Sequence, residues 1–140
     1  MKPYIVLVDD DRHILRFLKQ ALEESGYAVA ATSSGSQALA LLKVRMPDLL
    51  ILDLNMPEPD GIDLLRIERT QFPYLRVLVI SGYLKGEQLE AMRFVGAFGT
   101  LEKPFTAEAV VRKVREMIGE AQKPAAQSAK KRARANRGEA

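Results

Sequence analysis

The chain has 140 residues, of which 47% are hydrophobic, so it is long enough to form one domain with a real core. It contains no cysteine, which excludes disulfides, thiolate metal sites and a cysteine nucleophile. No apolar stretch reaches the eighteen or so residues of a membrane span, and no secretory signal precedes the first apolar run. We therefore expect a cytoplasmic protein.

The net charge of +3 is unevenly distributed. From Gln122 onward the chain carries six Lys or Arg and one acid, so this segment has a charge of +5 and the remainder a charge of −2. The same segment contains Pro124, scattered alanines and no apolar period, which is typical of disorder. We predict one domain over residues 1–121 and a basic, disordered tail over residues 122–140.

Apolar runs and helical spacings alternate along the predicted domain. The runs predict strands at residues 4–8, 27–31, 49–52, 76–80 and 98–101. After each run, apolar residues recur at helical spacing, near residues 14–22, 38–42, 62–67, 89–95 and 110–118. Asp11 and Thr106 are suited to capping the first and last of these helices, and Ser25-Gly26 ends the first.

Five strand–helix alternations are typical of an α/β fold with a parallel sheet and helices on both faces. Because parallel crossovers are nearly always right-handed, few ways of winding the chain are possible. We expect a flavodoxin-like, doubly wound five-stranded sheet in the order 2-1-3-4-5. In that order the switch point, where ligands bind, lies between the first and third strands.

Polar residues stand where the predicted strands end. Asp9-Asp10-Asp11 follows the first strand, Asp53 the third, Ser81 the fourth and Lys103-Pro104 the fifth. In a parallel sheet these carboxyl ends meet at one edge. Unit charges about 4 Å apart repel by about 4 kcal/mol at an effective dielectric near 20, so clustered carboxylates imply a bound cation. Mg²⁺ suits such a site, and it takes only one or two carboxylates.

One carboxylate would then be free for chemistry. Asp53 is the candidate, because it stands alone at a central strand end whereas Asp9 and Asp10 are redundant neighbours. A carboxylate can attack phosphorus to form an aspartyl phosphate. Mg²⁺, the Lys103 ammonium and the Ser81 hydroxyl would then bind the phosphoryl oxygens.

The chain resembles a response-regulator receiver domain of the CheY-like superfamily, the phosphorylated partner of sensor histidine kinases in bacterial two-component phosphorelay signalling. The resemblance covers residues 4 to about 119. It rests on five segments in the right order, which are Ile5–Asp11, Pro47–Pro57, Asp60-Gly61, Ser81-Gly82 and Lys103-Pro104-Phe105.

This resemblance implies that Asp53 is the phosphoacceptor and also a ligand of Mg²⁺. Asp10 and the backbone carbonyl of Asn55 would hold the metal directly, and Asp9 would hold it mostly through water.

The resemblance further implies that Ser81 bonds to the phosphoryl group and moves toward it on activation. Lys103 would pair with the same group, and the Lys103-Pro104 peptide would be cis. Such a domain is a signalling switch rather than an enzyme. It would receive phosphate from a sensor histidine kinase or phosphotransfer protein. With no output domain, it would act by binding another protein through its fourth helix, fifth strand and fifth helix.

Two positions depart from the usual pattern of the family. Thr100 occupies the place of an aromatic residue whose rotation reports phosphorylation, and Phe98, two positions earlier, is the nearest ring. Tyr83 lies two positions after Ser81, where a bulky ring would limit the access of water to the phosphoryl group. We predict that Tyr83 lengthens the phosphoryl lifetime. Equal decay rates in the phosphorylated wild type and in Tyr83→Ala would contradict this.

Other functions remain as alternatives. One is an interaction module of the same fold that works without phosphorylation. Another is a Mg²⁺-dependent phosphohydrolase with an aspartate nucleophile, although no lid domain is available to enclose a substrate. A nucleotide-binding domain is disfavoured, because no glycine-rich loop follows the first strand. The tail could contact nucleic acid weakly, could contact anionic lipid, or could be a solvated end without function.

Overall fold

The computed structural model describes residues 2–53, 67, 70–82 and 99–119. Its strands are β1 (Tyr4–Val8), β2 (Ala28–Thr32), β3 (Leu49–Asp53), β4 (Val77–Ser81) and β5 (Gly99–Glu102). Its helices are α1 (Arg12–Glu24), α2 (Gly35–Val44) and α5 (Ala107–Ile118). The helices predicted near residues 62–67 and 89–95 lie, apart from Ile67, outside the described residues.

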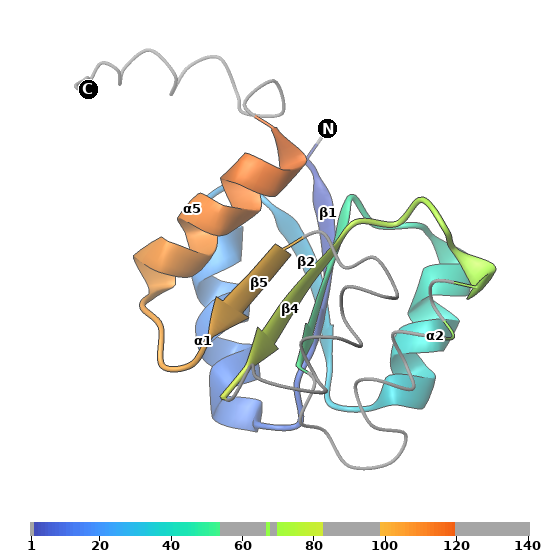
Figure 1. Cartoon of the computed structure of the whole chain (residues 1–140), viewed down its shortest axis with the longest axis horizontal. Helices are drawn as coiled ribbons and strands as arrows, with labels where there is room; N and C mark the ends of the chain where they lie inside the picture. The colour runs from blue at the N-terminus through green and yellow to red at the C-terminus, as the bar shows by residue number, and fades with distance from the viewer. Residues whose placement is uncertain (1, 54–66, 68–69, 83–98, 120–140) are drawn as a thin grey trace.

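The five strands form one parallel sheet in the order β2-β1-β3-β4-β5, as predicted from the alternation of strands and helices. Helices α1 and α5 cover one face of this sheet and α2 lies on the other (Figure 1). The central strands β3 and β4 are buried along their whole length, because both of their faces are covered. Their continuous apolar runs are what burial on both faces requires.

Successive residues of β1 and β3 pack into two separate cores. Ile5, Leu7 and Ile51 contribute to the core beneath α1 and α5. Val6 and Leu50 belong to the core beneath α2. This division follows from the two-residue period of a strand, and it explains why both strands are apolar throughout except for Asp53, the last residue of β3.

Three strands begin and end one residue later than predicted. β2 ends at Thr32, β4 at Ser81 and β5 at Glu102, and each of these polar residues is paired with a residue of a neighbouring strand. Tyr27, predicted to start the second strand, instead donates its backbone N–H to Leu22 O at the end of α1. Hydropathy marks which residues are apolar, but backbone pairing decides where a strand ends.

The predicted caps are confirmed. Asp11 caps α1, its carboxylate accepting hydrogen bonds from the backbone N–H of His13 at 2.9 Å and of Ile14 at 3.3 Å. Thr106 caps α5 in the same way through Ala109. Gly26 follows α1 with a φ of +100°, a conformation that glycine adopts without strain. The Asp11 cap sets the direction in which the chain leaves β1.

The opposite end of α5 is also held in place. The guanidinium of Arg76, just before β4, donates hydrogen bonds to the carbonyl oxygens of Met117 and Ile118. These are terminal carbonyls of α5, which have no partner within the helix. The side chain of a loop residue therefore ties the last turn of α5 to the beginning of a central strand.

Candidate functional site

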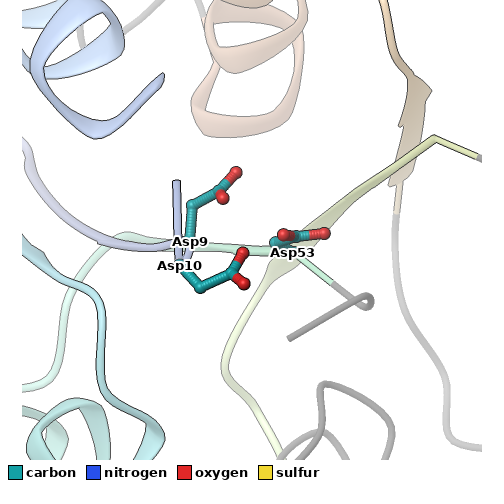
Figure 2. A group of neighbouring side chains, drawn as sticks. All are labelled: Asp9, Asp10 and Asp53. Carbon is teal, nitrogen blue, oxygen red and sulfur yellow. The ribbon is translucent and has the colours of Figure 1, made fainter. Parts of the chain in front are cut away.

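The carboxyl ends of β1 and β3 bring three aspartates together. Asp9 follows β1 and is fully buried, Asp10 is exposed, and Asp53 is the last residue of β3 and is 1% exposed. One carboxylate oxygen from each lies within 4.8 Å of the others, and Figure 2 shows the three side chains at the ends of their strands. Asp11, the third acid of the run, is turned away into the cap of α1.

Lys103 joins this cluster from the end of β5. Its Nζ lies 3.3 Å from Asp9 Oδ2 and 3.5 Å from Asp53 Oδ2, so one ammonium contacts two of the three acids. Its backbone N–H donates a 2.7 Å hydrogen bond to Ser81 O, which fixes the start of the loop after β5. The Lys103-Pro104 peptide bond is cis.

Ser81 lies in the same part of the sheet. It is the last residue of β4, is fully buried, and is paired with Glu102, the residue before Lys103. Thr100 is exposed on β5 and is paired with Val79, two residues before Ser81, so Thr100 and Ser81 lie on one face. Asn55, Tyr83 and Phe98 lie outside the described residues.

The cluster disfavours three simultaneous negative charges. Burial, and to a smaller degree the neighbouring Asp53 carboxylate, raise the pKa of Asp9 from 3.8 to about 6. The backbone N–H of Asp11, donating to Asp9 Oδ1 at 2.9 Å, and the Lys103 ammonium act in the opposite direction but do not cancel the effect. Within the described part of the chain, Asp9 Oδ2 has no hydrogen-bond donor, although Lys103 is near it.

These residues fit a divalent cation. The donor set is made only of carboxylate oxygens, which are the ligands that Mg²⁺ prefers. One ammonium cannot balance three carboxylates, and a buried carboxylate oxygen without a hydrogen-bond donor is costly unless a cation compensates it. The cluster can therefore hold a hard metal ion beside a strand-end carboxylate.

The positions of Asp9 and Asp10 after the first strand did not predict different environments for them, and only the family resemblance gave them different roles. In the structure Asp9 continues the backbone bonding of the sheet, its N–H donating to Thr32 O at 3.3 Å, and it is fully buried. Asp10 is the next residue and is exposed. The signal that could have separated them is position alone, since Asp9 directly follows the last apolar residue of β1 and Asp10 is one residue further from the sheet.

A doubly wound sheet with acids and a lysine at its switch point is the arrangement of a signalling receiver. The family model described as "Response regulator receiver domain" matches residues 5–115. The chain belongs to this family, whose members are signalling switches of two-component systems.

Characterised relatives share this domain. The chain is 40% identical over 100 residues to the alginate biosynthesis transcriptional regulatory protein AlgB of Pseudomonas aeruginosa, which covers 71% of this chain and 22% of the relative. It is 32% identical over 114 residues to the response regulator MprA of Mycobacterium leprae, covering 81% of this chain and 50% of the relative. The chain thus matches about half or less of the length of these proteins.

Solved structures agree with the fold. The chemotaxis protein CheY4 of Vibrio cholerae superposes with a TM-score of 0.80 at 27% identity, covering 84% of this chain and 99% of the other. A CheY-like receiver domain protein from Methanospirillum hungatei gives a TM-score of 0.81 at 27% identity, covering 84% and 94% of the two chains. Among the residues that the structure describes, no helix is long and apolar enough to cross a membrane.

Proposed function

We propose that this receiver accepts a phosphoryl group on Asp53 from a phosphohistidine of a sensor histidine kinase or phosphotransfer protein. An Asp53 carboxylate oxygen attacks phosphorus, so that a new O–P bond forms. The P–N bond to the imidazole breaks, and the histidine takes up a proton as it leaves. The observation that carries this proposal is the contact of Lys103 with the Asp53 carboxylate, within an acid cluster at the switch point of the sheet.

Each surrounding group has a role that its position supports. Lys103, already 3.5 Å from Asp53 Oδ2, would neutralise a phosphoryl oxygen bound there. Ser81, at the end of the adjacent strand, would donate a hydrogen bond to another. Asp10, Asp53 and the carbonyl of Asn55 would hold Mg²⁺, and Asp9 would hold it mostly through water. When bound, Mg²⁺ would offset the negative charge of the carboxylates and of the phosphoryl oxygens.

The new charge would bias the Ser81 loop and β5 between two arrangements and so change which protein is bound. The output face would comprise α5, β5 and the segment near residues 89–95. Thr100 is exposed on that strand, so a small hydroxyl stands where the family usually places a ring. In this proposal residues 1–121 act as a stand-alone cytoplasmic receiver, followed by the basic segment of residues 122–140. The domain would catalyse only its own phosphorylation and dephosphorylation.

The test is phosphorylation by a small phosphodonor, read by intact mass. In the presence of Mg²⁺ the protein is expected to gain one phosphoryl adduct. The same reaction with EDTA in place of Mg²⁺ is expected to give none, because the clustered carboxylates then repel the incoming anion. Equal labelling with and without the metal would contradict the proposed ligand set, and absence of labelling in both would favour an interaction module that works without phosphorylation.

A further inference from the structure

A second surface lies at the opposite end of the sheet, where the strands begin. Here a hollow of about 240 Å³ is lined by the loop after α2, the loop before β4 and the end of α5. The residues that line it are Met46, Pro47, Asp48, Tyr74, Leu75, Arg76 and Ile118. In Figure 1 the strand arrows point away from this end, so it is remote from the acid cluster. The phosphoryl chemistry makes no use of it.

Large apolar side chains are exposed in the hollow and just before it in the chain, because Met46 and Tyr74 line the hollow and Val44 ends α2 two residues before Met46. Tyr74 is 94% exposed, Val44 is 85% exposed and Met46 is 49% exposed. They are three of the four large apolar side chains that are exposed in the described part of the chain, and the fourth, Phe17, is on α1. Apolar side chains gathered at one end of a domain commonly mark a binding surface.

The backbone segment that carries two of these side chains is fixed by contacts with Tyr4. Asp48 accepts a 2.7 Å hydrogen bond from Tyr4 N through its carboxylate and donates a 2.7 Å bond from its own N–H to Tyr4 O. Arg45 stacks on the Tyr4 ring with its guanidinium carbon 4.3 Å from the ring centre. The segment that carries Val44 and Met46 is thus fixed to the start of β1.

Tyr74 is presented in a similar way. The residues that flank its turn are anchored, because Leu75 is 3% exposed and its N–H donates to Phe72 O at 3.1 Å. Phe72 packs against the core beneath α2. The ring of Tyr74 therefore projects into solvent from a turn whose flanking residues are anchored.

Cations alternate with the apolar side chains. Residues 43–46 read Lys-Val-Arg-Met, and all four are exposed. Arg76 adds a third cation on the lining of the hollow, where Asp48 is the acid. The sequence adds six further Lys or Arg after residue 122, and the chain leaves α5 at Ile118, on the rim of this hollow. Apolar tips between cations match the charge and polarity of an anionic bilayer surface.

We propose that this end of the domain, defined by Lys43–Met46, Tyr74 and Arg76, docks on the surface of an anionic lipid bilayer. Val44, Met46 and Tyr74 would enter the interfacial region, while Lys43 and Arg45 pair with lipid phosphates. Aliphatic tips favour a bilayer over nucleic acid, since stacking on bases uses aromatic rings and gains little from Val and Met. The acid cluster would face away from the membrane and stay accessible to a phosphodonor.

The first test uses fluorescence, because the chain contains no tryptophan. Tyr74→Trp in the full chain provides a single probe on the proposed surface, and Phe17→Trp provides a matched control on α1. Added phosphatidylglycerol-containing vesicles are expected to shift the emission of the Tyr74→Trp protein to the blue and to leave that of the control unchanged. No shift in the Tyr74→Trp protein, or equal shifts in both variants, would overturn the proposal.

The second test is co-sedimentation of the full chain with neutral and with anionic vesicles. Binding is expected only to anionic vesicles, and it should weaken about tenfold or more when Val44, Met46 and Tyr74 are all changed to serine. Phe17→Ser is the control, and Asp53→Asn should bind like wild type because the proposal is independent of phosphorylation. Undiminished binding by the triple variant would overturn the proposal and would assign the binding to the basic tail alone. Binding of the full chain to single-stranded DNA, without binding to vesicles, would also overturn the proposal.

Discussion

Replacing Asp53 with asparagine is expected to abolish phosphoryl incorporation from a small phosphodonor, which is the largest effect of any single change in this protein. The amide is nearly the same size as the carboxylate, so it leaves the packing at the end of β3 intact. It lacks the anionic oxygen that must attack phosphorus. Intact mass spectrometry in the presence of Mg²⁺ should show no adduct on the variant.

Asp11→Asn is the matched control for this experiment. It removes a carboxylate from the same acid run, but from one that caps α1 instead of joining the cluster. Because asparagine caps helices about as well as aspartate, the variant should fold and should be labelled like wild type. An adduct that persists in Asp53→Asn would mean that another residue accepts the phosphoryl group, and mapping its position would identify that residue.

Asp9→Asn is expected to stabilise the metal-free protein. Burial raises the pKa of Asp9 from 3.8 to about 6. Between pH 3.8 and about pH 6 the folded protein therefore keeps a proton on Asp9 that the unfolded chain has lost. The free energy of unfolding of the wild type should therefore fall as pH rises through this range. Above about pH 6, where Asp9 is ionised in both states, the full cost of its buried charge lowers the stability. At about 1.4 kcal/mol per unit, the gain in the variant near pH 8 is at most about 3 kcal/mol.

The measurement is chemical denaturation of both proteins in EDTA at several pH values. The free energies of unfolding should converge near pH 4 and separate as pH rises toward about 7. Asp10→Asn is the comparison, and its exposed carboxylate should give a smaller gain. The prediction would be contradicted by a variant less stable than wild type at high pH, or by the same dependence of unfolding free energy on pH in both proteins. Either result would show that Lys103 stabilises the charge of Asp9 at least as much as burial opposes it.

The strand order could be predicted because burial on both faces leaves a direct mark on the sequence. Residues 49–52 and 77–80 are continuous apolar runs, and these became the core of the two central strands β3 and β4. The strand ends were less predictable, because Thr32 and Ser81 join the sheet through backbone bonds that side-chain polarity does not record.

The meeting of Asp9, Asp53 and Lys103 could be predicted from their places at parallel strand ends. Their unequal environments could not. The environment of Asp9 depends on a backbone bond to Thr32 and on a lysine from the end of the last strand, which only the folded structure brings near. The outward display of Val44 and Tyr74 depends in the same way on contacts that the sequence does not record.

The bond between Arg76 and the last turn of α5 has a mechanical consequence. Its guanidinium fastens the last turn of the helix to the start of β4, whereas the first turn begins at Ala107, directly after its cap Thr106 and four residues after Lys103. The last turn is thus held by side-chain hydrogen bonds in addition to the core packing of Val110, Val114 and Ile118. A shift of Lys103 would therefore be expected to displace the first turn of α5 more than Ile118, because only the last turn carries the additional bonds to Arg76.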